Sequence, residues 1–289
     1  MVFLISIGLI CYPFISNYLM SLNQSSEIQT YQNDAKNLSD DKIKKMLEDA
    51  KQYNENLYGN VIVTDPFDPG INNIKDQKYE EMLSINGNPV MASLEIPAIN
   101  VNLPIYHGTT DEVLQKGVGH LRKTSLPIGG KGTHSVLTGH TGLSSSRLFT
   151  DINLLTKGDI FYIHVMNETL AYKIDQIKTV LPTDTSDLKI NPNEDYVTLV
   201  TCTPYGVNTH RLLVRGTRVP YDDAKEKITK KAVESTWMQE YKRALIIGAV
   251  VFVVLLIVYI VIKKILTKMK RLKLRKNPNE ISSDNDNST

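Results

Sequence analysis

Short apolar runs rich in β-branched residues alternate with polar turns through the central part of the chain. Runs of this length and composition predict β-strands. Strands are expected at residues 91–96, 101–106, 135–138, 159–165, 170–180, 196–202 and 211–219. A short helix is expected near 144–155. Because regular helices do not separate the runs, parallel β-α-β winding is not expected. Seven or eight such strands predict a mainly β domain over residues 79–222, a closed or nearly closed barrel without exposed edges.

The N-terminal region divides into an apolar part and an amphipathic part. Residues 1–22 are apolar enough for a signal peptide or a first membrane span. No small-residue cleavage site follows them, which favours an uncleaved anchor. In residues 23–58, apolar side chains recur at the helical period. One or two amphipathic helices are therefore expected beside the barrel.

A second apolar segment lies near the C-terminus. Residues 244–262 are nineteen apolar residues without a charge, and a helix of that length, at ~1.5 Å per residue, spans nearly the whole hydrocarbon core of ~30 Å. We predict a transmembrane helix there, with a juxtamembrane helix at 223–243 before it. The tail, 263–289, begins with eight basic residues and no acid up to residue 276. The positive-inside bias places this tail in the cytoplasm and the barrel outside.

Charge and cysteine content narrow the classes of protein. The formal net charge is only +2, and the basic cluster adjoins the membrane segment rather than a folded face, so no nucleic-acid partner is expected. A disulfide between Cys11 and Cys202 would join a bilayer residue to a folded domain, so two free thiols are expected. Cysteine and histidine residues do not occur at metal-ligand spacing, and we expect neither a metal nor a cofactor.

Residues 197–219 predict a β-hairpin with chemistry at its loop. Two β-branched runs flank an eight-residue loop that contains Pro204, Gly206 and Asn208. Cys202 and Arg211 lie at opposite ends of that loop, and we expect them to face each other across the ladder. A buried cysteine beside a solvated arginine is the alternative interpretation. A lone thiol in a domain outside the cell is more often a nucleophile, which favours an active site.

A thiolate that attacks a carbonyl needs a proton shuttle and a stabiliser for the oxyanion. His140 is the best candidate for the shuttle, because it follows a strand within T-G-H-T-G, where two glycines permit a sharp turn. His210, which adjoins Arg211, is a much weaker candidate for the proton shuttle than His140. Arg211 cannot accept a proton, so its expected role is to donate hydrogen bonds to a substrate carbonyl or to the oxyanion.

The segments T-L-V-T-C-T-P-Y-G-V-N-T-H-R-L-L-V-R-G and S-V-L-T-G-H-T-G-L resemble the catalytic motifs of the sortases, specifically the class C, pilus-building group. The resemblance covers roughly residues 96–221. It implies a closed eight-stranded β-barrel. It also implies that Cys202 attacks the Thr-Gly carbonyl of an LPXTG-type sorting signal, that His140 transfers protons, and that Arg211 stabilises the substrate and the transition state.

Residues 61–70, V-I-V-T-D-P-F-D-P-G, contain two Asp-Pro steps and a glycine, which exclude a helix. From its composition alone this stretch is a linker. The resemblance implies a lid over residues 59–78, in which Asp65 approaches Arg211 and Phe67 covers Cys202. Gly59 and Gly70 are candidate hinges for its opening.

The function implied by this set is that of a cysteine transpeptidase in the plasma membrane of a Gram-positive bacterium. Its substrates would be LPXTG-type pilins or surface proteins, and the acceptor an amine, namely a pilin lysine. A sortase that attaches single proteins to a peptidoglycan precursor is the alternative, and a non-enzymatic membrane scaffold is more remote. A papain-like hydrolase is disfavoured, because Cys202 follows a strand and His140 precedes it.

Overall fold

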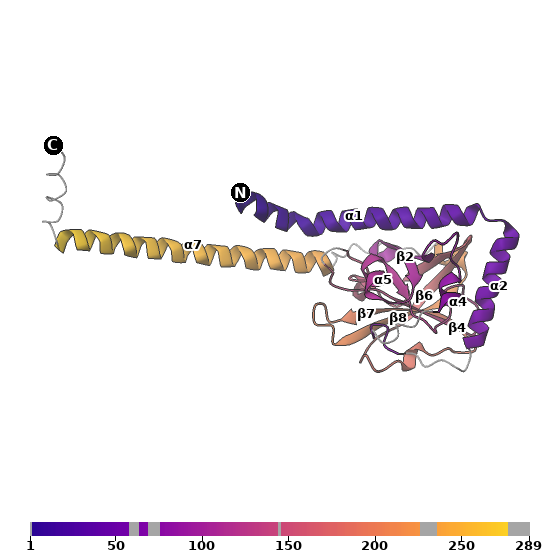
Figure 1. The fold of residues 1–289 in the computed structure, drawn as a ribbon. Coiled ribbons are helices and arrows are strands. Elements are labelled where there is room, and N and C mark those ends of the chain that lie inside the picture. Colours follow the sequence, from indigo (N-terminus) through magenta and orange to yellow (C-terminus); the bar gives the residue numbers. More distant parts are fainter. Residues whose placement is uncertain (1, 58–63, 69–75, 144–145, 226–235, 277–289) are drawn as a thin grey trace. The chain divides into compact units, whose positions relative to one another are not determined.

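The structure is a computed structural model that describes residues 2–57, 64–68, 76–143, 146–225 and 236–276 (Figure 1). Eight strands close into a barrel in the order β1-β2-β3-β4-β7-β8-β6-β5. They are β1 Val90–Ile96, β2 Val101–His107, β3 Val118–His120, β4 Thr133–Thr138, β5 Ile160–Val165, β6 Glu168–Val180, β7 Asp195–Thr203 and β8 His210–Val219. The predicted mainly β, closed barrel is confirmed. Every predicted strand is present, within three residues of its expected ends.

The prediction was incomplete in two places. Strand β3 has three residues, too few to show a period, and helix α5 (Asp111–Lys116) connects β2 to it. The barrel is therefore mixed: β2 pairs with β3 and β4 with β7 in parallel, and the other neighbours are antiparallel. Of the helix expected near 144–155, the described residues 146–155 form only a 3₁₀ turn, Ile152–Leu154. Leu148 precedes it at a φ of 37°, a left-handed conformation that a right-handed helix cannot include.

Strand β4 is buried on both faces, and this positions the site. Its Leu137 belongs to the main core inside the barrel. Val136 points the other way, into a smaller apolar cluster on the outer face of the sheet. The cluster, called here the outer apolar cluster, comprises Leu121, Val136, Val180, Leu188, Val200 and Leu213. Other segments of the chain therefore cover the outer face of the barrel at this cluster, and Phe67 is one residue that packs there.

Two N-terminal helices flank the barrel, as predicted. Helix α1 (Val2–Lys36) includes both the apolar segment 1–22, apart from its first residue, and the start of the amphipathic part. It is fixed by Tyr31, whose hydroxyl donates to the carbonyl of Met91 (2.7 Å) and accepts from the amide of Met166 (3.0 Å). Helix α2 (Asp40–Leu57) is held by the buried side chain of Asn54. Its Nδ2 donates to the carbonyl of Leu126, and its Oδ1 accepts from the amide of Leu126. That residues 1–22 anchor the chain stays a prediction.

The C-terminal helix α7 (Thr236–Lys276) contains a stretch, Tyr241–Met269, long and apolar enough to cross a membrane. It includes the predicted span 244–262, and in the part of the chain that the structure describes it is the one helix of this kind. Before it, helix α6 (Tyr221–Lys225) begins where a juxtamembrane helix was expected. The rest of that prediction up to residue 235, and the end of the tail, lie outside the described residues. The orientation across a membrane stays a prediction.

Candidate active site

The hairpin of β7 and β8 brings Cys202 opposite Arg211. The two are partners in the antiparallel ladder, so their side chains lie on the same face of the sheet. Thr203 and His210 also pair, which shortens the loop to Pro204–Thr209. Gly206 at φ 73° and Asn208 at φ 62° make the turn, as expected of these residue types. Local sequence was sufficient to bring these two groups together.

His140 reaches the same place through a parallel pairing. In the β4–β7 ladder Thr138 lies opposite Val200. Two hydrogen bonds extend the pairing: the Gly139 amide donates to the carbonyl of Val200 (3.1 Å), and the buried Thr201 hydroxyl donates to the carbonyl of Gly139 (2.7 Å). This register, continued by two residues, sets His140 beside Cys202.

Close packing explains the first glycine of the T-G-H-T-G motif. A Cβ atom on Gly139 would lie 2.7 Å from the ring of Phe149, whose own amide donates to the carbonyl of His140 (3.1 Å). Gly142, in contrast, has a φ of 79° and makes the turn. The sequence had assigned turning to both glycines, whereas the structure assigns close packing to one of them.

The lid residues lie directly on this site. The carboxylate of Asp65 accepts two parallel hydrogen bonds from the guanidinium of Arg211, Nε to Oδ1 at 2.9 Å and Nη2 to Oδ2 at 2.7 Å. The Phe67 ring lies 4.9 Å from Cζ of Arg211 and 5.7 Å from the ring of His140. It also packs against the outer apolar cluster. Phe67 therefore contacts both Arg211 and His140 on the face of the sheet that carries Cys202. The two candidate hinges, Gly59 and Gly70, lie outside the described residues.

Burial shifts the pKa values of both Cys202 and His140 beside the Arg211–Asp65 ion pair. Burial raises the pKa of the Cys202 thiol; Arg211 opposes this shift and Asp65 adds to it. Burial lowers the pKa of His140, with Asp111 opposing. Both shifts favour the neutral forms, a thiol and an imidazole. Both cysteines are free thiols, as expected.

Two other histidines of the barrel, His120 and His134, form buried hydrogen bonds within the fold. Nδ1 of His120 is hydrogen-bonded to the hydroxyl of Tyr79 (2.8 Å), and burial lowers the pKa of His120 to about 3. His134 bridges the carbonyl of Lys189 (2.9 Å) and the hydroxyl of Thr198 (2.7 Å), and its burial lowers its pKa to about 4. Both are neutral at physiological pH, and their hydrogen bonds hold strands and loops together.

A residue that the sequence did not single out anchors the far end of the lid. Tyr79, in helix α4 (Gln77–Glu81), is fully buried, and its hydroxyl accepts the amide of Gly108 (3.0 Å). The N-cap Asp76 accepts the amide of Tyr79 (3.2 Å). Asp is among the residue types that favour the N-cap position, so Asp76 is a signal in the sequence for the start of this helix. Residues 64–68 thus lie between two fixed points, Asn54 and Tyr79.

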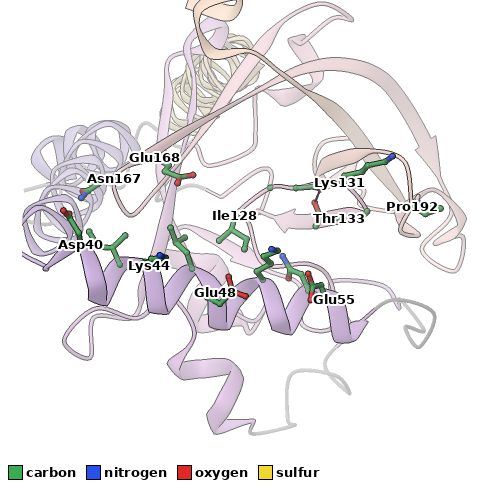
Figure 2. A pocket seen from close by; sticks show the side chains of 17 residues that line it. Asp40, Lys44, Glu48, Glu55, Ile128, Lys131, Thr133, Asn167, Glu168 and Pro192 are labelled. Carbon is green, nitrogen blue, oxygen red and sulfur yellow. Dashed lines mark hydrogen bonds between the residues drawn. The ribbon is translucent and has the colours of Figure 1, made fainter.

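A large cavity lies elsewhere, between helix α2 and the rim of the barrel (Figure 2). Its volume is about 980 Å³, and charged side chains of both signs line it, among them Lys44, Glu48 and Lys131. Thr133, the first residue of β4, borders it, whereas His140 follows the last residue of that strand. The cavity therefore belongs to the opposite end of β4 from the cysteine.

Comparison with known proteins identifies the class that this barrel and site define. The family model for the sortase domain matches residues 94–219. Together with the sortase structures described next, which are 46% identical to it, this match shows that the chain belongs to the sortase family.

Solved structures narrow the class further. Sortase C-1 from Streptococcus pneumoniae is 46% identical, with a TM-score of 0.64 and a match covering 68% of this chain and 99% of that one. A pilus-related sortase C of Group B Streptococcus is also 46% identical, with a TM-score of 0.62 and coverages of 67% and 97%. These structural neighbours are class C sortases, as the motifs predicted.

A curated relative, sortase D of Bacillus subtilis (strain 168), is 33% identical over 129 residues, which are 44% of this chain and 62% of the relative. The chain spans about half to two thirds of the length of the curated relatives that it matches.

Proposed function

We propose that this protein is a membrane-anchored cysteine transpeptidase that cleaves an LPXTG-type sorting signal between Thr and Gly and transfers the acyl group to a pilin lysine. The observation that carries the proposal is the Cys202–Arg211 pair, with His140 brought alongside it by the β4–β7 register. The likeness to a pilus-related sortase C supports the choice of pilin as substrate.

The geometry supports a two-step acyl transfer. With the lid open, His140 takes the proton of the Cys202 thiol, and the thiolate attacks the threonine carbonyl. Arg211 donates hydrogen bonds to the oxyanion of the tetrahedral intermediate. As this intermediate collapses, the Thr-Gly bond breaks, His140 protonates the leaving amine, and a thioester on Cys202 remains. The acceptor amine then attacks the thioester, His140 receives the amine proton, and collapse returns it to the cysteine sulfur.

Lid opening also frees the arginine. In the closed state Asp65 accepts hydrogen bonds from Nε and Nη2 of the guanidinium. The same two donors fit a carbonyl oxygen or an oxyanion. Asp65 therefore occupies the position that the reacting group of the substrate needs, and opening makes the nucleophile and the oxyanion donor accessible together.

Attachment of single surface proteins to peptidoglycan uses the same chemistry with a different amine. The lid over the site and the apolar C-terminal helix favour the pilin acceptor instead. Ladders of covalently linked pilin that require Cys202 would support polymerisation, whereas labelled peptidoglycan precursor joined to the substrate would support the alternative.

The acyl-enzyme is the direct test. We expect the full chain in detergent micelles, mixed with an LPXTG-type peptide, to gain the mass of the acyl fragment on Cys202, as measured by intact and peptide mass spectrometry. Cys202→Ala should gain nothing. Absence of the thioester even when Asp65→Asn and Phe67→Ala are combined would contradict the proposed function.

The lid should control access to the thiol. We expect Phe67→Ala to raise the rate of Cys202 alkylation by iodoacetamide about 10-fold, because the change removes both the apolar cover and the contact with the Arg211 cation. The measurement uses a Cys11→Ser background, so that only one thiol reacts. Tyr221→Ala removes an exposed aromatic ring elsewhere and serves as the control. Equal rates for both variants would rule out a closed lid.

A further inference from the structure

Two hydroxyl groups of strand β4 are buried without a hydrogen-bond partner among the described residues: Ser135 Oγ and Thr138 Oγ1. Ser135 is 2% exposed and Thr138 is fully buried. They lie three residues apart in an extended strand, so they point to opposite faces of the sheet. Ser135 shares the inner face with Leu137 of the main core, and Thr138 shares the outer face with Val136 and His140.

Thr138 lies on the face of the sheet that Phe67 packs against. It is paired with Val200, two residues before Cys202 in β7. Along β4 it stands between Val136, in the cluster that Phe67 packs against, and His140, whose ring Phe67 contacts. The lid therefore crosses the outer face of the sheet at the level of Thr138, and an apolar ring can neither donate nor accept a conventional hydrogen bond.

A buried hydroxyl without a partner destabilises the state that buries it. An unpaired buried group in a native structure needs an explanation, and a hydrogen bond made in another state is one. We infer that Thr138 is a substrate-binding residue whose hydroxyl hydrogen-bonds a backbone amide group of the sorting-signal peptide once the lid has left. This inference rests on the proposed function and adds a recognition group to the same site.

The spacing fits an extended peptide. Two residues of β-strand separate Thr138 from the level of His140 and Cys202, about 7 Å at ~3.3 Å per residue. An extended peptide rises by the same amount per residue, so the hydroxyl faces a peptide group about two residues from the scissile carbonyl. Val200 and Leu213 lie level with Thr138 in the sheet, and Val136 continues the apolar surface beyond it. The apolar residues of an LPXTG-type signal precede its scissile bond, so Thr138 contacts the acyl side of the peptide.

Thr138→Val tests the inference, because valine keeps the shape and removes only the hydroxyl. The substitution should raise the thermal midpoint of the full chain in micelles, since it removes an unpaired buried group. It should also lower kcat/KM for the LPXTG-type peptide about 5- to 10-fold, through KM, since one hydrogen bond to the substrate is lost. Thr138→Ser, which keeps the hydroxyl, should retain most of the lost activity.

A tighter lid would also slow turnover, so the decisive comparison uses Phe67→Ala, in which the lid no longer covers the site. There, Thr138→Val should still raise KM while leaving Cys202 alkylation unchanged. The matched control is Ser135→Ala, which removes the unpaired hydroxyl on the inner face and should leave KM unchanged.

Unchanged KM for Thr138→Val in the Phe67→Ala background, or an equal rise for Ser135→Ala, would overturn the inference. Failure to form the Cys202 thioester even when Asp65→Asn and Phe67→Ala are combined would instead overturn the proposed function.

Discussion

Arg211→Ala should lower kcat/KM for an LPXTG-type peptide about 10²–10³-fold, the loss that follows removal of one oxyanion donor. Arg211 lies opposite the nucleophile in the ladder, and its guanidinium fork already binds a carboxylate in the closed state. Arg211→Lys should recover little of the loss, because an ammonium group lacks the planar pair of donors. Steady-state kinetics of amide transfer, followed by release of the Gly-containing fragment, provide the measurement.

The chain offers a matched control for this prediction. Arg215 is on the same strand and the same face, four residues from Arg211, and it too forms a paired hydrogen bond with a carboxylate, that of Asp175. Arg215→Ala should keep most of the activity, since this arginine lies opposite Thr198 and not Cys202. Arg211→Ala also frees the lid, so each variant is compared in the Phe67→Ala background. A fully active Arg211→Lys would contradict the oxyanion role.

Acid should destabilise the barrel well before its carboxylates are protonated. The pKa values of His120 and His134 are lowered by burial to about 3 and about 4, against ~6.5 in the unfolded chain. Above pH 6.5 both states hold neutral imidazoles, so no stability is lost there. Below pH 6.5 the unfolded state binds protons that the folded state does not, and unfolding becomes easier as the pH falls. From pH 7.5 to 5.0 the two histidines together remove about 4 kcal/mol of stability.

A loss of this size lowers the thermal midpoint of a domain of this length by roughly 10 °C. Thermal unfolding of the full chain in nonionic detergent at pH 7.5 and 5.0, followed by circular dichroism, measures the shift. His210→Gln, which removes a histidine that is only partly buried at the loop, should leave the shift intact. An equal midpoint at the two pH values would show that both histidines become protonated within the folded barrel.

The elements that were predicted correctly depend on short stretches of chain. Strands such as β5 and β6 were readable because their apolar residues recur within each strand. The short β3 was missed because three residues carry no period. The helix expected near 144–155 failed because the left-handed Leu148 is a property of the backbone in this fold, not of leucine.

The candidate site, too, was predictable only where it depends on local sequence. His140 was selected for its glycine frame and by the resemblance, yet its place beside Cys202 follows from the parallel β4–β7 pairing, which joins segments 62 residues apart. The hydroxyl of Thr138 had no distinguishing signal, because its lack of a partner appears only when Phe67 and the neighbouring strands bury it.

The sequence by itself determined the β7–β8 hairpin and hence the facing pair of Cys202 and Arg211, because the turn residues between them set the register locally. It also determined the apolar C-terminal helix, which depends only on length and composition. Only the tertiary structure determined the ion pair at the site and the direction in which burial shifts the pKa values there. The Asp65–Arg211 pair joins residues 146 positions apart, and burial within the folded chain shifts the pKa values of Cys202 and His140 towards their neutral forms. Burial and long-range pairing are properties of the folded chain, because they depend on which segments exclude water from one another.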